Sequence, residues 1–215
     1  MKSDDLRISE IFYSLQGESR TVGLPTIFIR LTGCPLRCQY CDTSYAFSGG
    51  ETQSIAHIIE QVAGYNTRYI TVTGGEPLAQ PGCQELLRQL ADKGYSVSLE
   101  TSGALDVSKV DTRIVKVMDL KTPASAEESR NLYTNLQYLE RQDQLKFVIC
   151  NVDDYLWAKE KISEYQLDKK CEILFSPAMG EQDPTELAEW ILADQLPVRF
   201  QLQLHKVLWG NIAGK

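Results

Sequence analysis

Two hydrophobic periods alternate along this chain. Short runs rich in β-branched and aromatic residues are typical of buried strands, and they fall at 26–31, 69–73, 95–100, 113–119, 144–150 and 171–176, with a possible seventh at 200–204. Apolar residues spaced three and four apart are typical of amphipathic helices, and they fall at 54–63, 84–93, 127–139, 153–165 and 184–194. We expect no full helix in the short connection 101–112.

Residues suited to capping stand at the ends of several of these helices. Ser54, Asp153 and Asp183 are placed to act as N-caps, because their short side-chain oxygens can accept from the first free backbone N–H groups. Gly94 follows the second helix, where a glycine often takes the left-handed conformation that ends a helix.

The repeated β–α order predicts an α/β fold with a parallel sheet and right-handed crossovers. About six such units fall short of the eight that close a β/α barrel, so we expect a partial, open barrel. No internal repeat, low-complexity stretch or linker divides the sequence, and we therefore expect one domain over 1–215 with its core at about 25–205.

Composition narrows the class of function. The chain has 215 residues and a net charge of −7, which argues against a nucleic-acid surface, since such surfaces carry basic patches. No apolar run is long enough to cross a membrane, and the first residues do not resemble a signal peptide. We therefore expect a cytoplasmic enzyme that acts on a small molecule, with its six cysteines kept reduced.

Functional residues of parallel β/α folds lie at the C-terminal ends of the strands. Five of the predicted strands run directly into polar or glycine-rich sequence at such ends, in the segments 32–43, 73–77, 100–103, 119–123 and 176–180. We therefore expect one site at this edge of the sheet.

Three cysteines follow the first of these strands in a C-x₃-C-x₂-C spacing. Cys34, Cys38 and Cys41 can hold three corners of a [4Fe-4S] cluster and leave one iron open to another ligand. A structural zinc site is the alternative, but it prefers two C-x₂-C pairs and four closed ligands. The other cysteines stand singly on apolar segments, namely Cys83, Cys150 and Cys171.

The cysteine loop, with Tyr40 before its last cysteine, and the Gly-Gly-Glu-Pro turn at 74–77 resemble the radical S-adenosylmethionine (SAM) superfamily. This resemblance implies that the open iron binds the amino and carboxylate groups of SAM. It also implies that the reduced cluster cleaves SAM to a 5′-deoxyadenosyl radical, which takes a hydrogen atom from the substrate.

A narrower resemblance covers most of the chain. Segments 14–19 (SLQGES), 28–34 (FIRLTGC), 41–43 (CDT), 100–103 (ETSG) and 203–206 (QLHK) are similar to those of the 7-carboxy-7-deazaguanine synthases of the queuosine pathway. This family converts 6-carboxytetrahydropterin to 7-carboxy-7-deazaguanine with loss of ammonia. The resemblance implies a [4Fe-4S] cluster, SAM that is regenerated after turnover, and Mg²⁺. It also makes 1–24 a substrate-binding extension of a radical SAM domain.

The resemblance assigns the pterin site to two groups of residues. The pterin edge would be contacted by Leu15, Gln16, Gly17 and Glu18, with Thr73 also on the substrate. Arg30 would hold the substrate carboxylate, for which a guanidinium is a bidentate partner. Two simpler alternatives stay open, namely an Arg30 paired with a nearby acid and a Glu18 that is only a solvated loop charge.

The same resemblance places Thr43 on Mg²⁺ and Asp42 near SAM, although the two residues could simply cap the turn. The implied SAM-binding residues are Tyr40, Asp42, Gly75, Ser102, Asp119, Lys121 and Ser176. The 119–121 segment departs from the Ser-Pro-Lys of many relatives, so only Lys121 transfers directly. His57 is expected on a helix surface, and His205 is a further site candidate without an assigned role.

The family also implies a flavodoxin or ferredoxin as electron donor and a homodimer. Two other functions stay open. A glycyl-radical-enzyme activase would share the cysteine loop and a small barrel, but has no reason to keep the SLQGE and CDT segments. An iron–sulfur electron carrier would close the fourth iron with a protein ligand and would not need the Gly-Gly-Glu-Pro turn.

Overall fold

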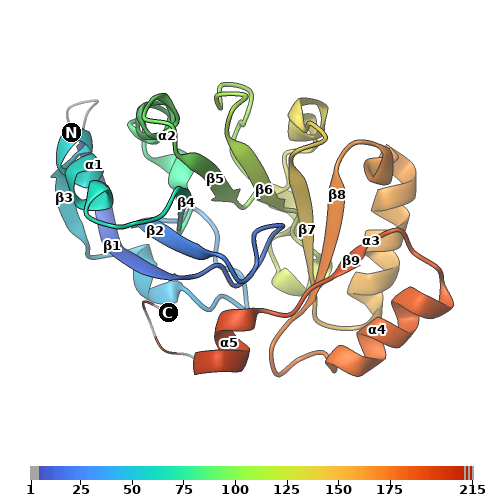
Figure 1. The fold of residues 1–215 in the computed structure, drawn as a ribbon. Coiled ribbons are helices and arrows are strands. Elements are labelled where there is room, and N and C mark those ends of the chain that lie inside the picture. Colours follow the sequence, from blue (N-terminus) through green and yellow to red (C-terminus); the bar gives the residue numbers. More distant parts are fainter. Residues whose placement is uncertain (1–4, 211, 213, 215) are drawn as a thin grey trace.

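The structure is a computed structural model, and it describes residues 5–210, 212 and 214. Its described residues build one mixed sheet in the order β3-β1-β2-β4-β5-β6-β7-β8-β9 (Figure 1). The strands are β1 (Asp5–Leu15), β2 (Pro25–Leu31), β3 (Glu51–Ser54), β4 (Tyr69–Gly74), β5 (Ser96–Thr101), β6 (Val115–Asp119), β7 (Gln144–Ile149), β8 (Glu172–Pro177) and β9 (Arg199–Phe200).

In the order of the sheet, every pair of neighbours from β2 to β9 is parallel. Strand β1 lies between β2 and β3 and is antiparallel to both. Figure 1 shows the strands fanned into an open arc. The predicted α/β fold with a partial, open barrel is therefore confirmed, and the six predicted strands correspond to β2 and β4–β8.

The helices cover the sheet in two halves. Side chains of α1 (Ile55–Ala63) and α2 (Cys83–Asp92) share one apolar cluster with β2, β4 and β5. Those of α3 (Val152–Tyr165) and α4 (Pro184–Ala193) share a second cluster with β7 and β8. A short last helix, α5 (Leu204–Trp209), has no buried residue.

Most of the capping residues predicted from the sequence lie at the starts and ends of these helices. The Ser54 hydroxyl accepts from His57 N and the Asp183 carboxylate accepts from Thr185 N and Glu186 N, which confirms both N-caps. Gly94 has the left-handed φ of +84° expected of it. The prediction that Asp153 is the N-cap of α3 is wrong, because Asn151, two residues earlier, caps this helix.

The prediction of a helix at 127–139 is also wrong. The chain there forms two short 3₁₀ turns, Glu128–Arg130 and Tyr133–Tyr138. Asn131 bonds both the N–H and the carbonyl of Lys121, and the Asn135 amide donates to the carbonyl oxygens of Gly103 and Leu105. The segment thus follows the loops at the strand ends instead of its own helical period.

The strand predicted at 200–204 is much shorter than expected. Only Arg199 and Phe200 pair with β8, and α5 begins at Leu204. Two further strands, β1 and β3, were not predicted. Strand β3 is a short, polar edge strand, and β1 carries a bulge between Ile8 and Glu10 that interrupts its alternation.

Candidate active site

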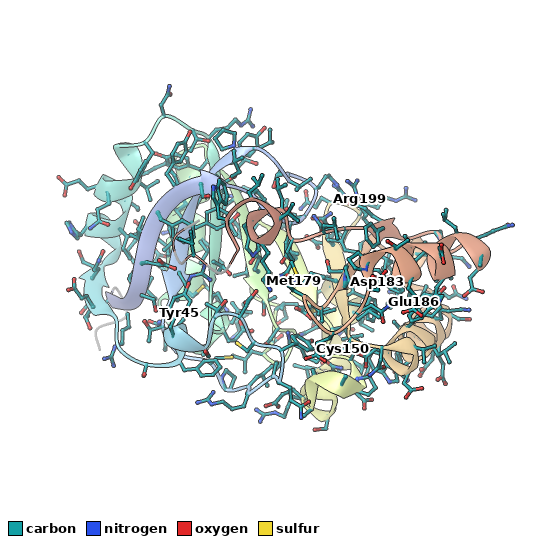
Figure 2. The ribbon with its side chains drawn as sticks, turned by 90° about the horizontal axis from the view of Figure 1, so that it is seen from below. Tyr45, Cys150, Met179, Asp183, Glu186 and Arg199 are labelled. Carbon is teal, nitrogen blue, oxygen red and sulfur yellow. The ribbon has the colours of Figure 1, made fainter. Side chains whose placement is uncertain are left out.

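The C-terminal ends of β2, β4, β5 and β6 border a cavity of about 330 Å³, which the 15–18 loop, the cysteine loop and α5 also line. Figure 2 is a view from below Figure 1, and its labelled residues Tyr45 and Met179 both line this cavity. The cavity brings together all but one of the predicted site residues, namely Leu15, Gln16, Gly17, Glu18, Arg30, Cys34, Cys38, Tyr40, Cys41, Asp42, Thr43, Thr73, Gly75, Ser102, Asp119 and Lys121. Ser176 is the exception, since it is fully buried in β8 outside the lining.

The three loop cysteines are half-buried and all face the cavity. Arg37 orders their loop by donating to the carbonyl of Cys34 at 2.8 Å, and Cys41 N donates to the Cys38 carbonyl at 3.2 Å. Burial raises the pKa of the Cys38 thiol to about 11, so ligation by this sulfur needs a strong positive charge to displace its proton.

This donor set fits a cluster held by three thiolates. Within 5–210, 212 and 214, no three His, Cys, Asp or Glu side chains converge on the position of a single metal ion. The remaining cysteines are buried in the apolar clusters and do not line the cavity, namely Cys83, Cys150 and Cys171.

The Gly-Gly-Glu-Pro turn packs directly on the cysteine loop. Gly75 N donates to the Leu31 carbonyl at 3.1 Å, and Glu76 N donates to the Gly33 carbonyl at 2.8 Å. A Cβ at Gly75 would lie 2.2 Å from Gly33 O, so only glycine allows this approach.

Glu76 in the same turn is structural. Its buried carboxylate accepts from Leu78 N, Ser102 N and the Thr101 hydroxyl, at 3.1, 2.7 and 2.9 Å. The Ser102 hydroxyl donates to the same carboxylate, so Glu76 fixes the end of β4 to the end of β5 and holds Ser102 in the cavity lining.

A chain of buried charges crosses the cavity. Lys146 of β7 lies 2.7 Å from a Glu18 oxygen and 3.5 Å from Asp119, which also pairs with Lys121 at 3.1 Å. Burial opposes ionisation of Asp119, but the two ammonium groups outweigh it and hold its pKa below the usual 3.8. Burial likewise opposes the charge of Lys146, yet Glu18 and Asp119 raise its pKa.

Two polar atoms at the cavity wall have no partner among the described residues. They are Asp119 Oδ1 and the Tyr40 hydroxyl, and both are buried. Burial and the nearby Asp119 raise the pKa of Tyr40, so its hydroxyl stays protonated and needs an acceptor. Because buried polar groups are normally satisfied, these atoms mark a part of the wall that suits a polar ligand.

The loop before β2 carries its polar side chains inward. Glu18 is only 8% exposed and accepts from Gln203 Nε2 at 2.6 Å, so it is not a solvated loop charge. Gln16 is also buried, and its amide donates to the Thr71 hydroxyl at 3.0 Å. Gly17 contributes backbone, because a Cβ there would meet His205 Nδ1 at 2.2 Å.

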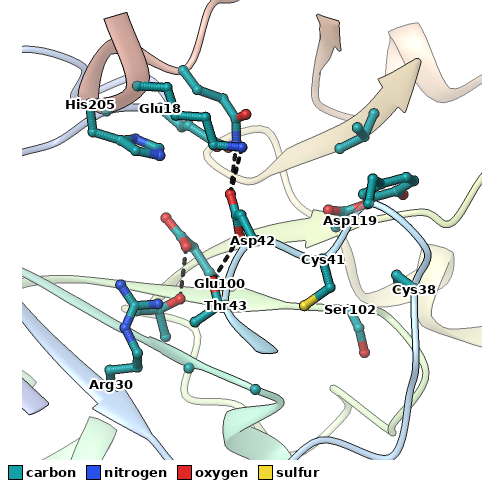
Figure 3. A pocket seen from close by; sticks show the side chains of 18 of the residues that line it. Glu18, Arg30, Cys38, Cys41, Asp42, Thr43, Glu100, Ser102, Asp119 and His205 are labelled. Atoms are coloured by element: carbon teal, nitrogen blue, oxygen red, sulfur yellow. Dashed lines mark hydrogen bonds and ion pairs between the residues drawn. The ribbon is translucent and has the colours of Figure 1, made fainter. Parts of the chain in front are cut away.

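Arg30 and Thr73, on neighbouring parallel strands, already have protein partners. Arg30 Nε donates to Glu10 Oε1 at 2.7 Å, which is the nearby acid of the simpler alternative. The Thr73 hydroxyl donates to Glu100 at 2.9 Å. Figure 3 shows Arg30, Glu18 and Glu100 around the same space.

Asp42 and Thr43 are linked to α5. The Thr43 hydroxyl donates to Asp42 Oδ1 at 2.8 Å, and Lys206 Nζ lies 2.8 Å from Asp42 Oδ2 (Figure 3 labels both loop residues). Burial opposes ionisation of Asp42, but Lys206 outweighs it and lowers the pKa of this carboxyl. The Thr43 side chain does not cap the following turn, so capping is not its role.

Six polar residues of the site were given no role from the sequence, namely Glu10, Tyr45, Glu100, Lys146, Gln203 and Lys206. Three of them, Glu100, Gln203 and Lys206, lie in segments that carry the resemblance. Lys146 had a readable signal, because it is a lone charge inside the otherwise apolar run of β7. Glu10 had none, since the bulge in β1 decides which way it faces. His57 is exposed on α1 as expected, while His205 lines the cavity.

Comparison with known proteins gives a consistent result. The radical SAM superfamily model matches residues 28–191. A 7-carboxy-7-deazaguanine synthase of Chlorobaculum tepidum is 44% identical and covers 95% of this chain and 94% of its own. The enzyme of the same name from Koribacter versatilis is 40% identical and covers 95% of this chain and 97% of its own.

Solved structures agree on the fold. The crystal structure of QueE from Escherichia coli has a TM-score of 0.77 at 26% identity and covers 94% of this chain and 95% of its own. Streptococcus suis SuiB bound to S-adenosylmethionine has a TM-score of 0.56 at 13% identity, with 80% of this chain and 45% of its own covered, which is a likeness of fold alone. Among the described helices, none is both long and apolar enough to span a bilayer.

Proposed function

The chain belongs to the 7-carboxy-7-deazaguanine synthases of the radical SAM superfamily, and we propose how its own residues divide the binding of cluster, SAM and pterin in this cavity. Its reaction converts 6-carboxytetrahydropterin to 7-carboxy-7-deazaguanine with loss of ammonia, using a [4Fe-4S] cluster and SAM. When bound, the cluster and SAM supply the radical that removes a hydrogen atom from the substrate.

Cys34, Cys38 and Cys41 would hold the cluster, in keeping with three thiols that face one cavity. The backbone at Gly75 lies against the cysteine loop and would accept from the SAM ammonium. The polar wall would bind the rest of SAM through Tyr40, Asp42, Ser102, Asp119 and Lys121, and the unpartnered atoms of Tyr40 and Asp119 support this role.

The pterin would lie on the opposite wall. Its amino, amide and ring N–H groups are donors, and a Glu18 kept ionised by Lys146 is a suitable acceptor. The backbone of Leu15 and Gly17, the amide of Gln16 and the hydroxyl of Thr73 would complete that edge. Arg30 would bind the 6-carboxylate through its two terminal nitrogens, because only Nε is used by Glu10.

Thr43 would provide an oxygen to Mg²⁺, and the hard oxygens beside it fit that ion. Asp42 is a poorer candidate ligand because Lys206 already occupies one of its oxygens. The Thr43 hydroxyl donates to the other, which leaves its lone pairs directed elsewhere. The Thr43→Val variant is therefore expected to need a higher Mg²⁺ concentration for half-maximal turnover, as measured by titrating Mg²⁺ in the activity assay.

The remaining assignments concern the setting of the enzyme. We propose that the enzyme is cytoplasmic, because a reducing compartment keeps the loop thiols available. The family resemblance is the reason to propose a homodimer and a flavodoxin or ferredoxin as electron donor. The substrate is a small molecule, in agreement with the size of the cavity.

One observation carries these assignments: three thiols, a buried ionised glutamate and a guanidinium share a single cavity of about 330 Å³. The test measures binding of 6-carboxytetrahydropterin, and of tetrahydropterin without the carboxylate, to the holoenzyme with SAM. Arg30→Ala is expected to abolish the preference for the carboxylated pterin. Glu18→Gln is expected to weaken both pterins about equally, because it removes an acceptor from their shared edge. An unchanged preference in Arg30→Ala would contradict the assignment of Arg30.

A further inference from the structure

In the middle of strand β1 the alternation of side chains between the two faces of the sheet shifts by one residue. Before the bulge, Leu6 and Ile8 point into the apolar core, and after it Ile11 packs against the same core. The pairing shifts from Ile8↔Leu31 to Glu10↔Arg30, so one extra residue, Ser9, lies between the two registers. The bulge therefore turns Glu10 to the face that Arg30 occupies.

Glu10 has two donors on the same oxygen. Its Oε1 accepts from Arg30 Nε at 2.7 Å and from the Tyr45 hydroxyl at 2.8 Å. Tyr45 lies in the turn just after Thr43 and so ties the end of the cysteine loop to β1. The Arg30 guanidinium also lies near two aromatic rings, 5.5 Å from the centre of Phe12 and 5.7 Å from that of Tyr45.

These contacts constrain the plane of the guanidinium without occupying its terminal nitrogens. The pair with Glu10 uses Nε, and neither Nη group bonds to another residue within 5–210, 212 and 214. The two Nη groups form the fork that binds a carboxylate in two hydrogen bonds. Arg30 and Tyr45 line the cavity, whereas Glu10 stands behind them outside the lining. Glu10 bonds both of these lining side chains, so its effect on a ligand passes through Arg30 and Tyr45.

We propose that Glu10 is a positioning residue for substrate specificity, which holds Arg30 so that its free Nη pair recognises the 6-carboxylate of the pterin. This inference rests on the proposed role of Arg30. The side chains of the pair are 14% and 23% exposed, so removing the carboxylate also leaves a largely buried guanidinium without this partner and lowers stability. The functional effect of Glu10 is on recognition of the carboxylated substrate.

The test compares affinities of the SAM-loaded holoenzyme for 6-carboxytetrahydropterin and for tetrahydropterin. Glu10→Ala is expected to weaken binding of the carboxylated pterin about tenfold and to leave tetrahydropterin binding unchanged, because a hydrogen bond to a charged group is lost from the carboxylate site only. Glu10→Gln keeps an acceptor for Arg30 and Tyr45 and should restore affinity to within about threefold of the unchanged enzyme.

Glu51→Ala on the neighbouring edge strand is the matched control and should change neither affinity. Equal weakening of both pterins by Glu10→Ala, or no weakening of either, would overturn the inference. If Arg30→Ala abolishes the preference while Glu10→Ala keeps it, only the role of Glu10 fails. If Arg30→Ala keeps the preference, the proposed carboxylate site itself fails. Should Glu10→Ala not fold, Tyr45→Phe removes the second anchor of Glu10 and must reduce the same preference.

Discussion

Gly75 has little freedom to change. A methyl group there would overlap the Gly33 carbonyl and also meet Cys34 Cβ at 2.8 Å, and neither neighbour is the end of a flexible side chain. Gly75→Ala must therefore push the turn away from the cysteine loop, at a cost of about 3 kcal/mol. We expect it to lower the iron content of reconstituted protein at least severalfold, as measured by iron and sulfide analysis.

Gly64→Ala is the control for that substitution, because Gly64 has a right-handed helical conformation at the end of α1 and is exposed. It should leave iron content unchanged. Full cluster loading in Gly75→Ala would show that the close approach is not needed.

His205 gives a prediction about pH. Burial lowers its pKa below 6.5, the usual value, although Glu18 and Asp42 partly oppose this. The folded chain thus binds fewer protons at this site than the unfolded chain, and the free energy of unfolding falls as the pH drops through 6.5. His205→Gln should reduce the loss of stability between about pH 7.5 and pH 5.5, measured by urea unfolding. An identical loss in both proteins would refute this effect.

Site residues could be predicted where the chemistry is local in the sequence. The cysteine spacing and the Gly-Gly-Glu-Pro turn need only their neighbours to be recognised. Glu100 meets Thr73 because β4 and β5 are paired, and Lys146 of β7 meets Glu18 of the loop before β2 across the cavity, so no local pattern encodes either pair. Ser176 was placed by resemblance alone, and its side chain is buried outside the lining.

At the scale of elements, periodicity predicted β2 and β4–β8 because each keeps one regular pattern along its length, alternating in β5 and nearly continuous in β2, β4, β7 and β8. It missed β1, whose apolar positions Leu6, Ile8 and Ile11 change parity at the bulge. It also predicted a helix at 127–139, where Asn131 and Asn135 bond to the loops at the strand ends instead. Both errors arise where tertiary contacts override the local period.

The short helix α5 is held over the cavity by three contacts. Leu204 N donates to the Gly17 carbonyl at 2.9 Å, Gln203 donates to Glu18, and Lys206 pairs with Asp42. Because α5 has no buried residue, these polar contacts rather than apolar packing keep it in place.

Lys206→Met should therefore loosen this helix. We expect faster amide hydrogen exchange over 204–210 and a higher KM for the pterin, with little change in the free energy of unfolding. Lys169→Met, in an exposed turn far from the cavity lining, is the control. Unchanged exchange in Lys206→Met would mean that the ion pair does not hold α5.

At the scale of the whole molecule, a buried ion pair that stabilises the fold lies at the N-terminal ends of the strands, opposite the cavity at their C-terminal ends. Lys116 near the start of β6 pairs with Asp143 just before β7 at 2.8 Å, and both side chains are almost completely buried. Asp143 also accepts from the backbone N–H groups of Lys116 and Glu140. Neither charged residue lines the cavity.

Asp143→Ala should lower the free energy of unfolding by about 3–5 kcal/mol, because it leaves the Lys116 ammonium buried and unpaired. The KM of the folded fraction should not change. Denaturant unfolding and steady-state kinetics on the same preparation test both halves of this statement. A raised KM at unchanged stability would contradict the separation of the two ends.

The family and the cavity together indicate that this chain contracts the ring of a carboxylated pterin in the site next to its cysteine loop. The most direct measurement incubates the reconstituted protein anaerobically with reductant, SAM, Mg²⁺ and 6-carboxytetrahydropterin, and follows the products by mass spectrometry and ammonia assay. We expect 7-carboxy-7-deazaguanine and ammonia in equal amounts, with SAM largely regenerated. Cleavage of SAM with the pterin left unchanged would contradict the claim.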